Sequence, residues 1–254
     1  METTAAIGRE TFRVRAGEVG AGGWLRPPAL CDWLQEAAGN HAISLGFGTE
    51  DLLRNGLTWV LSRLHLQVRR MPRWGEAAVV ETWPSGVLRL RALREFRVTG
   101  EGGGLLAAAT SGWLVLKVEG KRPVRPPPEV GVIAEKAPPR LLSDPFEDLP
   151  APGAGAAPGP FFRVGRYDLD LNGHANNVAV VRWLLEALPD APDPARPLSI
   201  EAEFRGESFE GDRLQSRVEA VGDGGSASLW PGSGMRGKWP GPRWFPAGRR
   251  PVCL

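Results

Sequence analysis

The spacing of apolar residues changes once along the first half of the chain. Between Pro27 and Leu45, apolar residues recur at helical spacing, which predicts one long helix. From Leu57 onward, apolar and polar residues alternate with period two, as in antiparallel strands that have one buried face. The strands predicted on either side of the helix cover residues 11–15, 57–68, 77–83, 87–98 and 105–118.

The second half repeats this order of elements. A strand at 161–167 precedes a helix at 177–188, and strict alternation predicts two further strands at 199–205 and 213–221. Each half therefore predicts one long helix against an antiparallel sheet. The fold class is α+β, and the two halves look like a duplicated unit although their sequences barely match.

A segment rich in proline, glycine and alanine separates the two halves. Between residues 121 and 160 prolines recur too often to sustain a sheet ladder, so we expect a linker there. The predicted organisation is one unit at 1–120, the linker at 121–160, a second unit at 161–225 and an atypical tail at 226–254.

Composition narrows the class of protein. The 254 residues contain 42% hydrophobic and 24% charged residues and carry a formal net charge of +2, which is typical of a soluble globular protein. Basic residues are scattered, so no nucleic-acid partner is indicated. No apolar run approaches the ~20 residues of a membrane-spanning helix, and residues 1–11 lack the features of an export signal. Cys31 and Cys253 offer neither a disulfide framework nor a zinc motif, so we expect a cytoplasmic protein without a metal.

The densest polar cluster lies just before the second helix. Asp170, Asn172 and His174 alternate there, so in an extended segment their side chains lie on one face. A carboxylate, an amide and an imidazole together can accept a proton from water, orient the water and polarise a carbonyl. The N–H groups of the following helix would favour developing negative charge. The cluster therefore suits hydrolysis.

Two other interpretations of this cluster stay open on the residues alone. The run from Asp168 to Gly173 imitates the start of an EF-hand calcium loop, but Ala179 stands where a bidentate glutamate is required. Alternatively, these residues are structural, and Asn176 or Asn177 simply caps the helix.

Several motifs in one order resemble the acyl-ACP thioesterases of plants and bacteria. The stretch Asp168-Leu-Asp-Leu-Asn-Gly-His-Ala-Asn-Asn-Val178 is similar to the family's D-x-D-x-N-x-H-x-N-N-V signature, and Trp183-Leu-Leu-Glu-Ala-Leu-Pro189 to the helix that follows. Three further segments resemble the family's first domain. They are Trp33–His41, Thr58–Arg63 and Pro72–Gly75.

The resemblance implies a fold, a site and a reaction. The fold would be a double hotdog, with an acyl-chain pocket in 1–120 and catalysis in 161–225. Asp170, Asn172, His174 and Glu207 would be catalytic, and no metal or organic cofactor would be needed. The partner would be an acyl carrier protein bearing a fatty acyl chain, in fatty acid biosynthesis, and the protein could form a homodimer. No membrane partner is expected.

The residue after Glu207 departs from the plant pattern. Ser208 stands where plant members have a cysteine that was once proposed as the nucleophile. Without a thiol, the simpler expectation is direct attack by water, with Glu207 or Asp170 as general base. Two functions stay open as alternatives to acyl-ACP hydrolysis. The chain could be an acyl-CoA thioesterase of the same fold, or a degenerate homologue that binds acyl groups without hydrolysing them.

Other conspicuous polar residues have simpler explanations. His41 lies on the apolar side of the first helix and is expected in the core, whereas His65 alternates onto the polar face of a strand and is expected in solvent. Arg89, Arg91 and Arg94 could meet an acidic carrier protein or could line a solvated sheet edge.

The tail does not read as the end of this fold. At least one more strand should follow Val221, yet residues 229–246 are crowded with proline and glycine, and no acidic residue follows Asp223. With GC-rich codons and a frame shifted by one base, the tail can read KVARAALV, which is a plausible strand. We therefore expect that 226–254 is translated out of frame, which would leave a sheet edge unpaired.

Overall fold

The computed structural model describes residues 6–150, 153, 155–188, 190, 192–221, 224–231 and 252–253, with the backbone alone from Ala220 onward. The chain divides into two compact units. Unit 1 contains Met1–Pro145 and Asp193–Ile200, and unit 2 contains Phe146–Pro192 and Glu201–Leu254.

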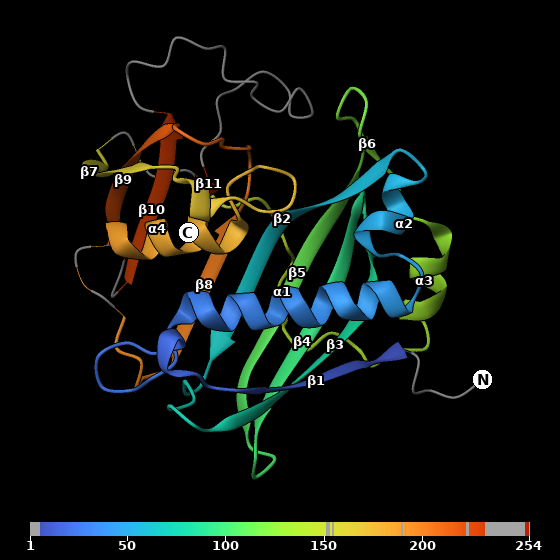
Figure 1. Cartoon of the computed structure of the whole chain (residues 1–254), viewed down its shortest axis with the longest axis horizontal. Coiled ribbons are helices and arrows are strands. Elements are labelled where there is room, and N and C mark those ends of the chain that lie inside the picture. Colours follow the sequence, from blue (N-terminus) through green and yellow to red (C-terminus); the bar gives the residue numbers. More distant parts are fainter. Residues whose placement is uncertain are drawn as a thin grey trace. The chain divides into compact units, whose positions relative to one another are not determined.

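Unit 1 is an antiparallel sheet with one long helix packed against it (Figure 1). The strand order is β1-β3-β4-β5-β2, and the short strand β6 pairs with β5. Helix α1 packs against β1 and β3, as the helical spacing predicted. The strands are β1 (Gly8–Arg13), β2 (Leu57–Val68), β3 (Ala77–Leu88), β4 (Arg91–Gly100), β5 (Leu105–Lys117) and β6 (Pro123–Val124), and the helices are α1 (Pro27–Ser44), α2 (Thr49–Leu53) and α3 (Pro128–Ala134).

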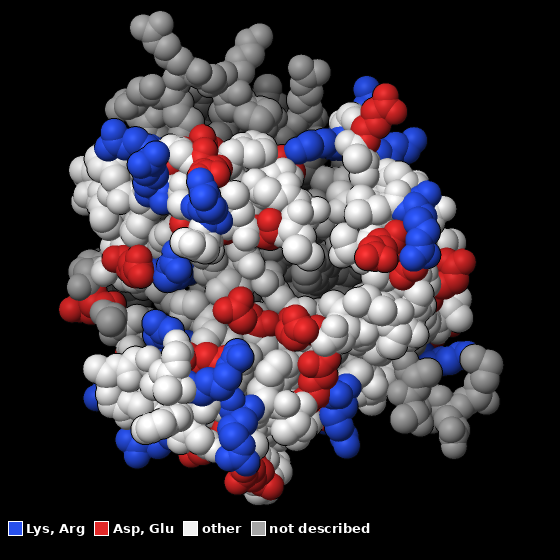
Figure 2. Space-filling view, in the orientation of Figure 1, with Lys and Arg blue, Asp and Glu red and all other residues white. Residues whose placement is uncertain are grey.

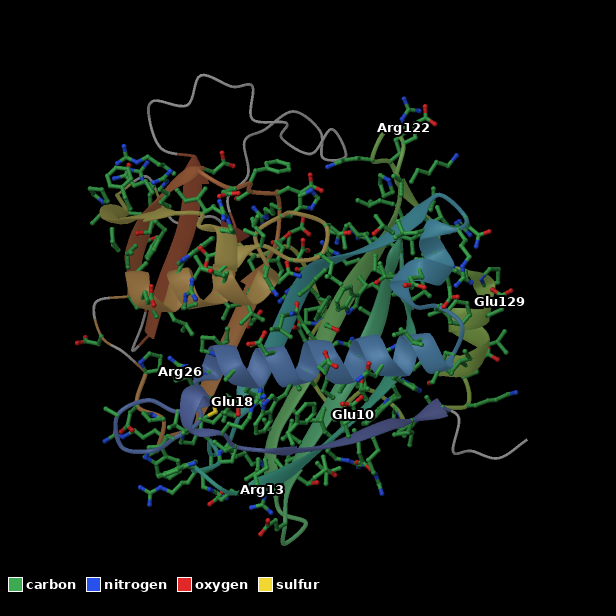
Figure 3. All side chains as sticks on the ribbon, viewed as in Figure 1. Glu10, Arg13, Glu18, Arg26, Arg122 and Glu129 are labelled. Atoms are coloured by element: carbon green, nitrogen blue, oxygen red, sulfur yellow. The ribbon has the colours of Figure 1, made fainter. Side chains whose placement is uncertain are left out.

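A short polar segment fixes the beginning of α1. Proline at the first helical position is compatible with a helix start, because that N–H has no partner within the helix. The side chain of Arg26, immediately before the helix, donates to the main-chain carbonyl of Glu18 (Figure 3). The Glu18 carboxylate in turn accepts from Trp33 Nε1 at 3.2 Å on the first turns of α1. These contacts of Glu18 with Arg26 and Trp33 therefore define where α1 starts.

The segment predicted as a linker contributes to the core of unit 1. Helix α3 packs against β3, and the carbonyl oxygen of Pro138 accepts a 2.9 Å hydrogen bond from Trp83 Nε1. The fully buried Glu95 carboxylate on β4 accepts from the main-chain N–H of Leu141 at 3.0 Å. Apart from β6 and the start of β7, this proline-rich segment lies outside the ladder, and some of its main-chain groups bond to side chains of the sheet.

Unit 2 also has one helix against antiparallel strands, which are drawn in yellow to red in Figure 1. Helix α4 packs against β7, β9 and β10. Strand β7 starts earlier than predicted and contains two prolines, which it tolerates because it is the last strand in the sheet order. The elements are β7 (Ala157–Arg163), α4 (Asn177–Ala187), β9 (Arg213–Val221), β10 (Gly224–Pro231) and β11 (Val252–Cys253). Strand β8 (Leu198–Glu203) is divided, with residues 198–200 assigned to unit 1 and residues 201–203 to unit 2.

The sheet of unit 2 continues into the predicted tail. Strand β10 pairs with β9 from Gly224↔Val221 to Pro231↔Leu214, so Ser226–Pro231 lie in the ladder. No proline precedes Pro231 in this strand, which leaves its N–H groups able to pair. Most of the tail, residues 232–251 and 254, lies outside the described residues, so the frameshift stays a prediction.

Charge and hydropathy of the described residues show two simple features. On the face drawn in Figure 2, acidic and basic side chains are interspersed. Within the part of the chain that the structure describes, no helix is long and apolar enough to cross a membrane.

Candidate active site

The polar cluster forms a closed loop between β7 and α4. A turn of 3-10 helix at Arg166–Asp168 leads into the loop, and Leu169 and Ala175 pair as an isolated antiparallel bridge across it. Gly173 has a φ of 75°, a left-handed conformation that glycine adopts without strain. The bridge and this glycine bring Asp170 and His174 opposite each other.

The Asp170 carboxylate is used inside this loop. Its Oδ1 accepts from the main-chain N–H of Asn172 at 2.8 Å and of His174 at 3.0 Å. The Asn172 side-chain amide lies 3.4 Å from Asp170 Oδ2. Asp170 therefore fixes the backbone that carries Asn172 and His174, which is a common use of aspartate in turns.

Asn176 caps the start of helix α4, as the structural interpretation of this cluster expected. The Asn176 side-chain oxygen accepts from the N–H of Val178 at 2.9 Å. The N–H groups of Ala175 and Asn176 also donate internally, to the carbonyl oxygens of Ser208 and Asp168. These three donors are occupied, and the oxyanion role expected of the N–H groups of this helix stays a prediction.

His174 faces Glu207, which lies 33 residues further along the chain. The His174 Nδ1 and Glu207 Oε1 atoms are 3.7 Å apart, and the two side chains are 27% and 18% exposed. The ring of Phe209 meets the imidazole edge-on, with the centroids 5.0 Å apart. The hydrogen bond from Ala175 N to Ser208 O, at 2.8 Å, holds the loop beside the segment that carries Glu207.

These contacts join the four residues that the family resemblance selected. Asp170 touches Asn172 and the backbone of His174, and His174 meets Glu207. Ser208 is buried. The arrangement places an imidazole and a carboxylate together at a partly exposed position, so a water molecule beside them could contact both. Such a pair can remove a proton from water and return it to a leaving group.

The structure shows where the other conspicuous polar residues lie, and the expectation for His65 is wrong. His65 is buried rather than solvated, and its Nδ1 lies 2.7 Å from Asp144 Oδ2, because the segment after α3 covers this part of β2. Arg94 lies on the central strand β4 and faces inward: its Nη1 lies 3.0 Å from Nδ1 of the buried His41, and burial lowers the pKa of the guanidinium to about 10. The core position expected for His41 is confirmed.

Solved structures define the class of fold. The 12:0-ACP thioesterase of Umbellularia californica covers 89% of this chain with a TM-score of 0.78 at 28% identity, and 93% of that protein is covered. An acyl-ACP thioesterase from Bacteroides thetaiotaomicron covers 100% of this chain with a TM-score of 0.79 at 24% identity, and 97% of it is covered. The fold is therefore a double hotdog, which confirms the expected architecture.

Sequence comparison then gives the family. The model of the acyl-ACP thioesterase N-terminal domain matches residues 6–133, and that of the C-terminal domain matches residues 160–230. This chain belongs to the acyl-ACP thioesterase family. It is 32% identical over 202 residues to the coriander (Coriandrum sativum) oleoyl-acyl carrier protein thioesterase, and 28% identical over 251 residues to an Arabidopsis thaliana counterpart, both chloroplastic. These matches cover 71% and 90% of this chain but only 53% and 68% of the two relatives.

Proposed function

We propose that this chain hydrolyses fatty acyl-ACP to a free fatty acid and ACP. The observation that carries the proposal is the His174–Glu207 pair at 3.7 Å, in a loop whose backbone Asp170 holds. Membership of the family and the names of the curated relatives support acyl-ACP as the substrate class.

The pair suits direct attack by water. A water molecule beside His174 and Glu207 would attack the thioester carbonyl carbon, and Glu207 would take its proton. As the C–S bond breaks, His174 would protonate the leaving thiolate of the carrier, and the proton taken by Glu207 would then pass to His174 and restore the pair. Since the Asp170 carboxylate accepts two main-chain N–H groups, we assign the general base to Glu207 and a positioning role to Asp170. The exposed Asn172 amide would orient the water or the thioester oxygen.

An acyl-enzyme on Ser208 is the alternative mechanism. We expect Ser208→Ala to keep more than roughly a tenth of the wild-type kcat, because water rather than the hydroxyl makes the attack. Steady-state hydrolysis of acyl-ACP by the purified variant measures this. A loss as large as that of a catalytic nucleophile, or an acyl group trapped on Ser208, would overturn the water mechanism.

Comparing carriers tests the proposed substrate. Hydrolysis is measured on the same fatty acyl chain attached to ACP and to CoA, over a series of chain lengths, with His174→Ala as the inactive control. We expect a higher kcat/KM on acyl-ACP. Faster turnover of acyl-CoA would identify the related hotdog activity, and acyl-ACP binding without hydrolysis would identify a non-catalytic homologue. A cytoplasmic location, a homodimer and independence from cofactors stay predictions.

A further inference from the structure

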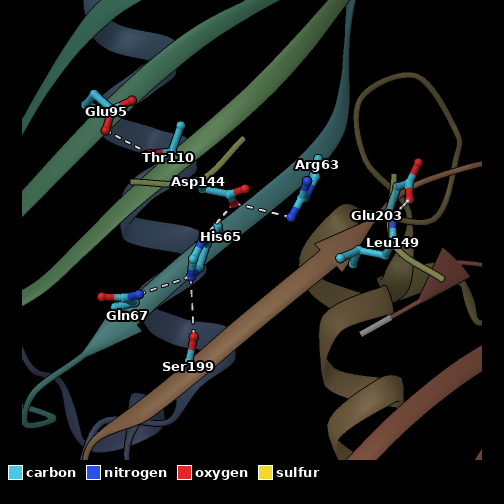
Figure 4. Close-up of polar contacts among 9 residues, drawn as sticks. All are labelled: Arg63, His65, Gln67, Glu95, Thr110, Asp144, Leu149, Ser199 and Glu203. Atoms are coloured by element: carbon cyan, nitrogen blue, oxygen red, sulfur yellow. Dashed lines mark hydrogen bonds and ion pairs between the residues drawn. The ribbon is translucent and has the colours of Figure 1, made fainter. Parts of the chain in front are cut away.

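A second cluster of interacting polar residues lies in unit 1 and consists of His65, Asp144 and Ser199. His65 on β2 contacts Asp144 through one ring nitrogen and Ser199 on β8 through the other (Figure 4). The His65 Nδ1 to Asp144 Oδ2 distance is 2.7 Å, and the Ser199 Oγ to His65 Nε2 distance is 3.4 Å. A hydroxyl, an imidazole and a carboxylate thus follow one another in the order that activates a serine.

The charges in this cluster fix the direction of the hydrogen bonds. Because Asp144 can only accept when it is ionised, His65 Nδ1 carries the proton and Nε2 is left as the acceptor. Ser199 then donates toward Nε2, and so does the Gln67 amide, whose nitrogen lies 3.3 Å from the same atom. The proton of the Ser199 hydroxyl therefore points at His65 Nε2, which can act as a base.

The carboxylate is supported from its other side. Arg63 Nη2 lies 3.3 Å from Asp144 Oδ2, and the side chains of Arg63 and Asp144 are 3% and 6% exposed. A buried guanidinium compensates the buried carboxylate, which in turn would stabilise an imidazolium on His65. The imidazole is buried as well, whereas Ser199 is exposed. The Ser199 hydroxyl, with the exposed Gln67 side chain near the same ring nitrogen, is therefore open to a reactant.

We propose that Ser199, His65 and Asp144 form a second nucleophilic centre, at which Ser199 is acylated by small activated esters or thioesters. Ser199 Oγ attacks the carbonyl carbon and gives its proton to His65 Nε2. The bond from that carbon to the alcohol or thiol breaks, and the leaving group takes the proton from His65. Water, deprotonated by His65, then hydrolyses the ester on Ser199 and regenerates the hydroxyl.

The simpler explanation is that the cluster only anchors the segment after α3 to β2. The His65–Asp144 bond and the Arg63–Asp144 ion pair already do this. Anchoring does not require a hydroxyl at Ser199, so the reactivity of Ser199 separates the two explanations.

Covalent labelling of the full chain tests the proposal. A fluorophosphonate probe, which reacts with activated serines, is followed by mass spectrometry of the peptide that contains Ser199, and p-nitrophenyl acetate is used in parallel as an acyl donor. We expect labelling of Ser199 in the wild type and none in Ser199→Ala. His65→Asn should lower the labelling rate at least ~100-fold, the scale of a positioned general base, while its amide can still donate to Asp144. Thermal unfolding of this variant shows whether it is folded.

Two controls make the result specific. Ser44 is also exposed, but its hydroxyl donates to the main-chain carbonyl of His41 at 2.8 Å, so Ser44→Ala should leave the labelling unchanged. His174→Ala should still be labelled at Ser199, which keeps this test independent of the proposed thioesterase site. Absence of a covalent adduct on Ser199, or equal labelling rates in the wild type and in folded His65→Asn, would show that the cluster is structural.

Discussion

Replacing Glu207 with glutamine is expected to lower kcat for acyl-ACP hydrolysis at least ~100-fold, the scale of a positioned acid or base. Glutamine keeps the size of the side chain but cannot take a proton from water. His174→Ala should cause a loss of similar size, because it removes the partner 3.7 Å away. The measurement is the kcat and KM of each purified variant on one acyl-ACP.

A double variant tests whether the two residues act as a unit. Combining Glu207→Gln with His174→Ala should cost little more than either change alone, because groups that serve one step are not additive. Glu210→Gln is the matched control, since this carboxylate three residues away is 53% exposed and pairs with Arg166. Near wild-type activity in either folded single variant would contradict the assignment.

Activity should depend on the hydrogen bonds that Asp170 accepts rather than on its negative charge. Asp170→Ala removes the acceptor for the N–H groups of Asn172 and His174, and a displacement of about 1 Å at a reacting group can cost ~100-fold in rate. Asp170→Asn keeps an oxygen at the same position, so we expect a loss of about tenfold or less in kcat.

The comparison of these two variants identifies the role of Asp170. Both are assayed on acyl-ACP, and their thermal unfolding is recorded to separate loss of folding from loss of rate. If asparagine were as damaging as alanine while the fold was intact, Asp170 would be the proton acceptor, and the assignment of Glu207 as the base would have to be revised.

Periodicity predicted the elements that have one buried face. The helix expected at 27–45 is α1 (Pro27–Ser44), and the strand expected at 213–221 is β9 (Arg213–Val221), because burial of one side imposes a regular spacing on the sequence. The segment after residue 120 has no such spacing. Its main-chain groups bond to individual side chains such as Glu95, and a pattern along the chain does not reveal such partners.

The site could be predicted only in part, because contacts between residues far apart in the sequence leave no pattern along the chain. The alternation of Asp170, Asn172 and His174 is visible in the sequence, whereas Glu207 was selected by family resemblance, since nothing near it indicates its partner. The backbone role of Asp170 depends on the closed loop, which Gly173 and the Leu169–Ala175 bridge form in three dimensions. Alternation places His65 on the polar face of its strand and does not reveal Asp144, the residue 79 positions away that covers it.

Two buried carboxylates accept hydrogen bonds from main-chain N–H groups of residues 121–160. They indicate where this protein can be recombined with a relative. Glu95 holds the N–H of Leu141, and Glu203 in unit 2 accepts from the N–H of Leu149 at 2.8 Å. A crossover at residue 120 or 160 would separate one of these carboxylates from the chain it holds. A crossover between Pro145 and Phe146 keeps both, provided that 193–200 travels with the first unit. Chimeras between family members should therefore be joined there.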